Sequence, residues 1–178
     1  MNLNVREATI DDIPLIANYW KKADQEYLNG MGVDISKMTD VDKFTQIIIQ
    51  QTMLPYESKK SYALVWEIDG VPIGHSNLSD IEYGETAKMH LHIWESPFRK
   101  KGVGVQCVKM SLPFYFKNLK LKVLVCEPYA LNPAPNKTLQ RAGFTFEKKY
   151  VTVPGPVCFE QEVNRWLISH KDFIKKYL

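Results

Sequence analysis

The first third of the chain shows one short alternating segment followed by apolar residues at helical spacing. Residues 3–8 alternate between apolar and polar side chains, which predicts a strand. Thr9, with Asp12 three positions later, is typical of a helix start. The apolar positions that follow have a helical repeat: Ile13, Ile16, Ala17 and Trp20. Residues 29–40 are predicted as a loop, and a second helix is expected at about 40–53.

The middle of the chain changes to the period of strands. Residues 61–68 are rich in aromatic and β-branched side chains, and Asp69 followed by Gly70 is a hairpin turn signal. The returning strand is expected at 71–78, and another strand at 88–94.

The last part of the chain returns to mixed elements. A helix is expected after residue 104, and Pro113 inside its apolar pattern should kink it or end it early. The remaining predicted elements are a strand at 121–126, a helix at about 134–142, and a closing hairpin of 144–153 and 157–167. The whole order is β-α-α-β-β-β-α-β-α-β-β, which predicts one α/β domain over residues 1–178, built on a mixed (α+β) sheet.

Composition places the chain among soluble globular proteins. Hydrophobic residues make up 45% and charged residues 24% of the 178 residues, and no apolar run reaches the length of a membrane span. The N-terminal residues lack the layout of a signal peptide. Three cysteines without a CxxC pattern predict free thiols in a reducing compartment. We therefore expect a cytoplasmic protein that does not contact membranes.

The net charge of +3 is too small to indicate a nucleic-acid partner, but its distribution is uneven. Residues 1–89 carry 8 basic and 14 acidic side chains, and residues 90–178 carry 15 and 6. A polyanionic ligand held by the second half and a cationic substrate met by the first would fit this division. The alternative is that the two halves intermix in space and the asymmetry has no functional meaning.

A basic glycine loop at residues 99–104 is the main candidate for chemistry. It lies between a predicted strand and a predicted helix, where glycines let phosphate oxygens approach main-chain amides and the helix dipole attracts anions. Arg99, Lys100 and Lys101 add positive charge. The P-loop pattern and an early G-x-G-x-x-G are both absent, which disfavours nucleotide hydrolysis and nicotinamide binding. The alternative is that the glycines only make the start of the helix flexible, the lysines are solvated, and no anion binds.

Two motifs in order give the sequence its family resemblance. The strand, the R-x-x-G-x-G loop and the following helix resemble the acetyl-CoA pyrophosphate loop of the GNAT superfamily of acyl-CoA N-acyltransferases. Residues 132–144 resemble that superfamily's later segment, where an Asn precedes a short helix ending in Gly-Phe. The resemblance spans residues 3–166, is strongest at 90–144, and is closest in style to the ribosomal-protein N-terminal acetyltransferase branch.

The resemblance implies roles for particular residues. Acetyl-CoA would be the acyl donor, with its pyrophosphate on the amides around Lys101, Gly102, Val103 and Gly104 and with Arg99 at the first position of the loop. The strand that pairs with the pantetheine arm would end at Ile93 and Trp94, and Asn132 would meet the same arm. Gly143 would end the short helix with a positive φ. The sheet would splay where two central parallel strands diverge.

One departure leaves the general acid unassigned. Many members of the superfamily place a Tyr four residues before the helix-ending Gly, where its hydroxyl can protonate the departing thiolate. This sequence has Leu139 at that position. Branches that resemble the ribosomal-protein N-terminal acetyltransferases also lack a Tyr there, so its absence does not exclude activity. Tyr129 is a weak substitute candidate. The missing Tyr also keeps open a non-catalytic acyl-CoA-binding or sensor domain of the same fold, and an unrelated phosphate-binding module is a third alternative.

Candidates for the catalytic base lie on the strand at 88–94. His90 and His92 share one face of it, and a His with a pKa near 6.5 suits proton transfer at neutral pH. Glu95 is the next candidate. Packed polar residues are the alternative for both histidines. A metal site at the H-x-H pair lacks further ligands at a supporting spacing, and Cys126 has no neighbouring His to make it a nucleophile.

The acceptor is expected to be a small-molecule or peptide amine, attacked directly without a covalent enzyme intermediate. Five acidic residues are candidates for attracting a cationic amine, with solvated loop acids as the alternative: Asp24, Glu26, Asp80, Glu82 and Glu85. The oligomeric state stays open, a homodimer included.

Overall fold

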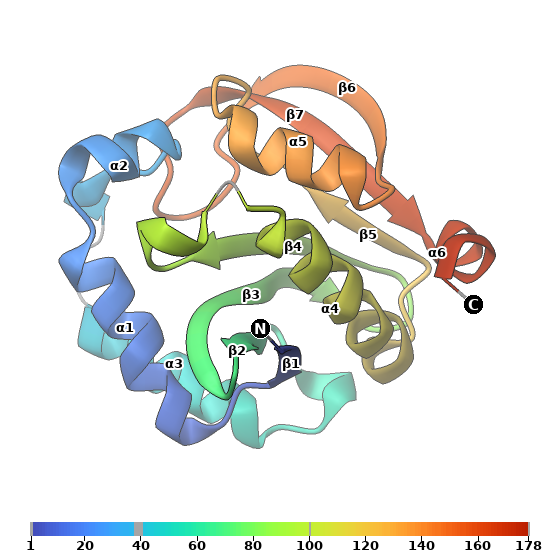
Figure 1. The fold of residues 1–178 in the computed structure, drawn as a ribbon, viewed down its shortest axis with the longest axis horizontal. Coiled ribbons are helices and arrows are strands. Elements are labelled where there is room, and N and C mark those ends of the chain that lie inside the picture. The colour runs from blue at the N-terminus through green and yellow to red at the C-terminus, as the bar shows by residue number, and fades with distance from the viewer. Residues whose placement is uncertain (1, 38–40, 100, 178) are drawn as a thin grey trace.

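A seven-stranded mixed sheet forms the centre of the molecule (Figure 1). The computed structural model describes residues 2–37, 41–99 and 101–177. The strand order is β1-β2-β3-β4-β5-β7-β6, and every described pair is antiparallel except β4 with β5. The strands are β1 (Leu3–Glu7), β2 (Tyr62–Ile68), β3 (Val71–Glu82), β4 (Thr86–Ile93), β5 (Val123–Cys126), β6 (Thr145–Thr152) and β7 (Gln161–Ser169). The predicted mixed sheet is confirmed.

Helices cover both faces of this sheet. They are α1 (Ile13–Lys22), α2 (Gln25–Gly30), α3 (Val41–Met53), α4 (Val103–Leu119), α5 (Pro133–Arg141) and α6 (His170–Tyr177). The sequence predicted four of them and missed the short helices α2 and α6. Each missed helix begins at a cap visible in the sequence: Asp24 accepts from Tyr27 N, and Ser169 accepts from Asp172 N. No helix of the described residues is long and apolar enough to cross a membrane.

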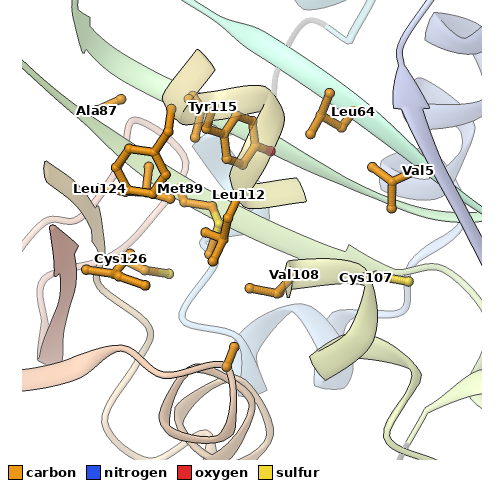
Figure 2. Close-up of a cluster of buried hydrophobic side chains, with 14 of the residues drawn as sticks. Val5, Leu64, Ala87, Met89, Cys107, Val108, Leu112, Tyr115, Leu124 and Cys126 are labelled. Carbon is orange, nitrogen blue, oxygen red and sulfur yellow. The ribbon is translucent and has the colours of Figure 1, made fainter. Parts of the chain in front are cut away.

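The main core lies between the sheet and the helices α4 and α5 (Figure 2). Leu112 and Tyr115 of α4 pack with Met89 of β4 and Leu124 of β5, and all four are fully buried. Helices α1 and α3 form a smaller cluster, which is joined by Trp94 from the segment after β4. The two clusters give the sheet one thickly covered face and one face on which polar side chains of β3 and β4 gather.

Of the two alternatives expected for Pro113, a kink or an early end, the early end is wrong, because α4 continues through it to Leu119. Pro113 is exposed, so the carbonyl that loses its partner can be solvated. A proline inside a helix costs about 3 kcal/mol, whereas each large apolar side chain buried beyond it contributes about 1.5–3 kcal/mol. Tyr115, Phe116 and Leu119 are all buried, and their burial outweighs the defect.

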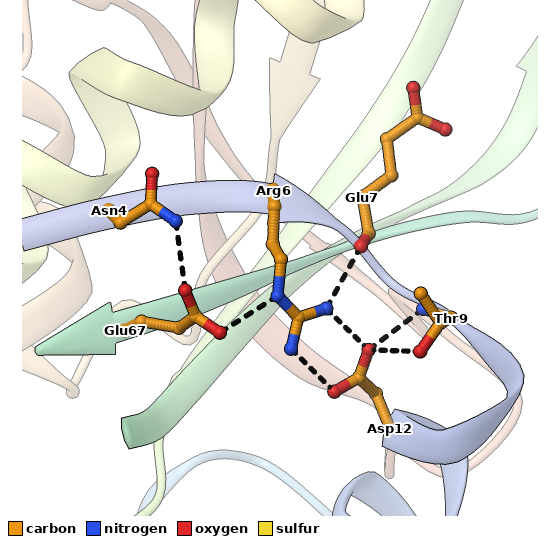
Figure 3. A network of polar contacts seen from close by, with 6 residues as sticks. All are labelled: Asn4, Arg6, Glu7, Thr9, Asp12 and Glu67. Atoms are coloured by element: carbon orange, nitrogen blue, oxygen red, sulfur yellow. Dashed lines mark hydrogen bonds and ion pairs between the residues drawn. The ribbon is translucent and has the colours of Figure 1, made fainter. Parts of the chain in front are cut away.

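An ion-pair network fixes the start of α1 to the edge of the sheet (Figure 3). The Arg6 guanidinium donates to both carboxylate oxygens of Asp12, at 2.6 and 2.8 Å, and to Glu67 at 2.8 Å. Thr9 donates to Asp12 through its amide and its hydroxyl, which closes the turn before α1. Hydrogen bonding from Arg6 holds the pKa of the Asp12 carboxyl below its usual range. The network sets the direction in which α1 crosses the sheet.

The two parallel strands diverge after three paired positions. Residues 86–88 of β4 pair with residues 123–125 of β5, and beyond them β4 continues to Ile93 with no described strand on that side. On its other side β4 pairs closely with β3, because Gly74 has no side chain: a Cβ there would lie 2.4 Å from the His92 carbonyl oxygen. The main chain of β4 from Met89 to Ile93 therefore has one edge that no described strand pairs with, called the free edge below.

Candidate functional site

The glycine loop adjoins the free edge of β4 and forms the N-terminus of α4. Gly102 caps the helix at φ 78°, a conformation that favours glycine, and it is exposed. Its carbonyl accepts from the amides of Val105 and Gln106 at 3.1 and 3.3 Å. The amides of Val103 and Gly104 precede these first bonds, as at any helix start. Lys100 lies outside the described residues. The loop has the backbone geometry that accepts anions.

Gly104 is placed against the end of β4. A Cβ at this position would lie 3.4 Å from Cδ1 of Ile93 and 3.9 Å from Thr138 of α5. The loop, the strand end and α5 therefore meet at one point, and a larger side chain in the first turn of α4 would fill the space between them. The two glycines serve different purposes: Gly102 allows the turn, and Gly104 allows the close approach.

Arg99 connects this loop to the strand end. Its Nε donates to the Ile93 carbonyl at 3.0 Å and its Nη2 donates to the Trp94 carbonyl at 2.8 Å. The guanidinium also lies over the Tyr27 ring of α2, 4.1 Å from the ring centre. The side chain thus holds the end of β4 and fastens α2 to it, while its charge stays near the site.

The second motif has the geometry of a capped helix. Asn132 caps α5 by accepting from Ala134 N at 3.3 Å, and its carbonyl accepts from Asn136 Nδ2. Gly143 has φ +83°, so the predicted positive φ is confirmed. Leu139 is fully buried in the core between α4 and α5. In many members of the superfamily that the sequence resembles, this position is a Tyr. Here it is a buried apolar side chain, which supplies no hydroxyl.

Tyr129, the substitute candidate for the acid, lies in the loop between β5 and α5. It forms an isolated bridge with Val163 of β7, and its ring packs edge-on against Phe159. Its carbonyl accepts from Asn136 Nδ2, which fixes the loop before α5. These contacts explain the presence of Tyr129 by its structural role in holding the loop before α5.

His90 and His92 point to the same polar face of the sheet, as their spacing predicts, but they have different surroundings. His90 Nε2 lies 3.0 Å from Ser79 Oγ of β3. Burial and the nearby Lys88 charge lower the pKa of His90 to about 4. His92 Nδ1 lies 3.3 Å from the Tyr19 hydroxyl of α1. Burial, with neighbouring charges, lowers the pKa of His92 well below its usual value. Both rings are therefore neutral at pH 7.

A third histidine, which the sequence analysis did not select, completes this face. His75 of β3 is opposite His92 in the strand register, and the two rings stack at 4.8 Å with 21° between their planes. Trp94 Nε1 donates to His75 Nδ1 at 2.8 Å. Burial lowers the pKa of His75 to about 3. The alternation of side chains along β3 could have placed His75 on this face. The contact between Tyr19 and His92 could not be predicted, because α1 and β4 are far apart in the sequence.

A buried charge cluster lies beside His90 and was also missed. Glu127, directly after β5, is 7% exposed and pairs with Arg165 at 2.6 Å and with Lys88 at 3.2 Å. Tyr150 donates a hydrogen bond to the same carboxylate. Burial alone would raise the pKa of Glu127, but these partners lower it below its usual value. Lys88 also pairs with Asp80 at 3.3 Å, so Asp80 already has a cationic partner.

A cleft of about 570 Å³ opens next to this face, between α1, α2 and the segment after β4. Its walls include the rings of Tyr19, Tyr27 and Trp94, and its charged lining consists of the carboxylates of Asp24 and Glu95 and the cations of Lys22 and Arg99. Glu95 is exposed in this wall.

Among the other acidic residues that the sequence suggested for attracting an amine, Glu85 pairs with Lys122 at 2.5 Å. Among the described residues, no group of three His, Cys, Asp or Glu side chains could hold a metal ion.

Comparison with known proteins gives one family. A family model described as an acetyltransferase (GNAT) domain matches residues 2–145. No curated protein matches the sequence.

Solved structures with the same fold include several acetyltransferases. The chain is 17% identical to RimL, a ribosomal L7/L12 alpha-N-protein acetyltransferase in complex with coenzyme A, with a TM-score of 0.74 over 95% of this chain and 94% of that one. It is 19% identical to the spermidine N-acetyltransferase from Vibrio cholerae in complex with CoA and spermine, with a TM-score of 0.74 over 97% and 98%. It is 11% identical to the aminoglycoside acetyltransferase AAC(6')-Ib in complex with coenzyme A and kanamycin, with a TM-score of 0.75 over 99% and 100%. At these identities the likeness shows the fold.

The neutral histidines predict a loss of stability on mild acidification. An unfolded His binds a proton below about pH 6.5, whereas His75 in the folded chain binds one only near pH 3. Between pH 7 and pH 5 each such group should therefore lower the free energy of unfolding by about 2 kcal/mol, at about 1.4 kcal/mol per pH unit below 6.5. Carboxyl groups titrate mainly below this window. Urea unfolding of wild type and His75→Gln at both pH values measures it, and equal losses in the two proteins would contradict the prediction.

Proposed function

The chain belongs to the acetyltransferase (GNAT) family, and we propose that it moves an acetyl group from acetyl-CoA to a primary amine by direct attack. Family membership supports acyl-CoA-dependent N-acetyl transfer, and the identity of the acceptor and the catalytic residues are the proposed part. The observation that carries the proposal is the free edge of β4, which runs from the polar face with His90 and His92 to the amides at the start of α4.

The donor side fits acetyl-CoA through its backbone. The amides around Lys101, Gly102, Val103 and Gly104 would hold the pyrophosphate, because they stand at an exposed helix start opened by a left-handed glycine. The main chain at Ile93 and Trp94 and the cap residue Asn132 would meet the pantetheine arm. Arg99 would act through the strand end that it already holds. When bound, acetyl-CoA supplies a thioester carbon and a sulfur leaving group.

The acceptor would enter by the cleft beside α1 and α2. Asp24 and Glu95 are the carboxylates of its wall with which a cationic amine could pair, and Lys22 and Arg99 line the same cleft. Tyr19 lines the cleft and contacts His92. His90 or His92 would take the proton from the amine nitrogen, with Glu95 as the next candidate. A neutral ring at pH 7 has a lone pair available for this step. We expect a small-molecule or peptide amine, in a cytoplasmic protein whose whole chain acts as one domain, with a homodimer as an open alternative.

A non-catalytic acyl-CoA sensor of the same fold is the second candidate. The buried Leu139 favours it, since this position supplies no acid for the departing sulfur.

Thiol release separates the two candidates. With acetyl-CoA and a panel of polyamines, aminoglycosides and peptide N-termini, an enzyme should release free CoA only when an acceptor amine is present, because the amine is the nucleophile. Free thiol is followed by a disulfide reagent and the acetylated product by mass spectrometry. Binding of acetyl-CoA by calorimetry, without turnover across the panel, would favour the sensor.

Substitution of Gly102 or Gly104 tests the donor site. Gly102→Val should abolish acetyl-CoA binding, because a β-branched residue rarely adopts φ 78° and the loop amides would be displaced. Gly104→Val should do the same by filling the space next to Ile93. Gly70→Val, also at a positive φ but in the β2–β3 turn, is the matched control and should keep binding. Calorimetry with CoA and circular dichroism measure the outcomes; two variants that bind like wild type would refute this site.

Two substitutions, His90→Ala and His92→Ala, test which of the two histidines is the catalytic base. General base catalysis contributes about 10²- to 10⁴-fold, so only one substitution should lower kcat by that factor while the KM for acetyl-CoA changes little. Steady-state kinetics with the best acceptor measure both constants. If neither substitution lowers kcat, the base lies elsewhere.

A further inference from the structure

His92 has a hydrogen-bonding environment that differs between its two ring nitrogens. Nδ1 faces the Tyr19 hydroxyl at 3.3 Å, and no hydrogen bond joins Nε2 to any described residue. Three rings contact that of His92: His75 stacks on it, Tyr19 lies tilted against it and Trp20 meets it edge-on, the last two at 5.5 and 4.9 Å between ring centres. One nitrogen is therefore occupied by the protein and the other is left open.

The Tyr19 hydroxyl has acceptors of its own. It donates to Met31 Sδ at 3.6 Å and lies 3.3 Å from the Tyr27 hydroxyl of α2. Burial raises the pKa of Tyr19, so it keeps its proton. With its hydrogen directed to Met31 or Tyr27, its oxygen can accept from His92 Nδ1. The hydroxyl is thus placed to act as the acceptor in the contact with His92.

The opposite arrangement leaves a worse defect. If Tyr19 donated to Nδ1, the ring hydrogen would lie on Nε2, where no described residue accepts it. Donors without partners are rarer in folded proteins than acceptors with spare capacity. A ring that carries its hydrogen on Nδ1 satisfies the donor and leaves a lone pair on Nε2, which is the atom available to a substrate.

We propose that Tyr19 is a positioning residue that fixes His92 with its hydrogen on Nδ1, and that Nε2 is thereby the base; this rests on the acetyl transfer proposed above. The acceptor first loses its ammonium proton to water. One N–H bond of the neutral amine then breaks and Nε2–H forms as nitrogen bonds to the acyl carbon and the C–S bond breaks. The Nε2 proton then passes to the departing sulfur. The ring returns to its starting state, so one histidine serves as base and acid, and the missing Tyr at Leu139 needs no replacement.

In His90 the two ring nitrogens have exchanged roles. Its Nε2 lies 3.0 Å from Ser79 Oγ, so the lone pair left open would be on Nδ1, the nitrogen nearer the main chain, and Lys88, with Asp80 and Glu127, is the charged group near the ring. The groups that face His92 are His75 on β3, Tyr19 and Trp20 on α1, and the charge of Arg99. His75 is fixed in turn, because Trp94 donates to its Nδ1. Of the two candidate bases, the structure favours His92.

The ring's hydrogen can be located without any turnover. In a chain of 20.6 kDa with four histidines, long-range ¹H–¹⁵N correlation spectra of ¹⁵N-histidine protein distinguish the two neutral tautomers. The spectrum of His92→Gln assigns the His92 signals. We expect the Nδ1–H pattern in the wild type and a shift toward the Nε2–H pattern in Tyr19→Phe. An Nε2–H pattern in the wild type would overturn the proposal.

Kinetics give the second readout. Tyr19→Phe should lower kcat about tenfold, the size of one lost hydrogen bond, with the KM for acetyl-CoA within about twofold. Tyr62→Phe removes another buried tyrosine hydroxyl, which accepts from Asn118 at 2.8 Å, and should leave both kcat and the tautomer unchanged. Equal kcat and an unchanged spectrum in Tyr19→Phe would refute the positioning role. Because the spectrum needs no acceptor, failure of the proposed acetyl transfer would be seen separately, in the thiol-release assay.

Discussion

The site depends on the short parallel pairing between β4 and β5. Three paired positions are enough to align the strands, and β5 then ends at Cys126 while β4 continues to Ile93. Main-chain donors and acceptors that would otherwise be used within the sheet are left at one edge, where a ligand can pair with them. The edge stays in place because β3 pairs along the other side of β4 and Arg99 holds the carbonyls at its end. A longer β5 would complete the sheet and remove the site.

The chemistry on the polar face depends on which groups are kept neutral. Acids and bases next to β5 are paired with one another, as Glu127 is with Arg165 and Lys88, so the charge there is locally balanced. Farther along β4, His75 and His92 lie among aromatic rings, and burial keeps them unprotonated. Protonation of either ring would place a charge against the other. The same packing that makes this region sensitive to acid therefore keeps a lone pair available at neutral pH.

The sequence predicted the fold better than it predicted the site. Alternation, residue type and turn signals located every strand, because these are local properties of the chain, and the positive φ of Gly143 was implied by the family resemblance. It could not decide between a kink and an early helix end at Pro113, where tertiary burial keeps the helix going to Leu119. Partners from distant segments could not be predicted: Tyr19 meets His92 across 73 positions, and Arg165 meets Glu127 across 38. The roles assigned to His90, His92, Asn132 and the loop amides remain predictions.

A depressed pKa appears at first to argue against a histidine base, since a weak base holds a proton poorly. The balance changes once the amine has begun to bond to the acyl carbon, because its nitrogen becomes far more acidic than the free ammonium ion and a weak base can take its proton. The resulting imidazolium is a strong acid in its buried surroundings, and it gives the proton readily to a departing thiolate, whose own pKa is near that of a cysteine. Low basicity therefore favours a residue that must accept a proton and pass it on within one turnover, provided that the ring does not rotate. The stacking of His75 on His92 and the contact with Tyr19 supply that restraint.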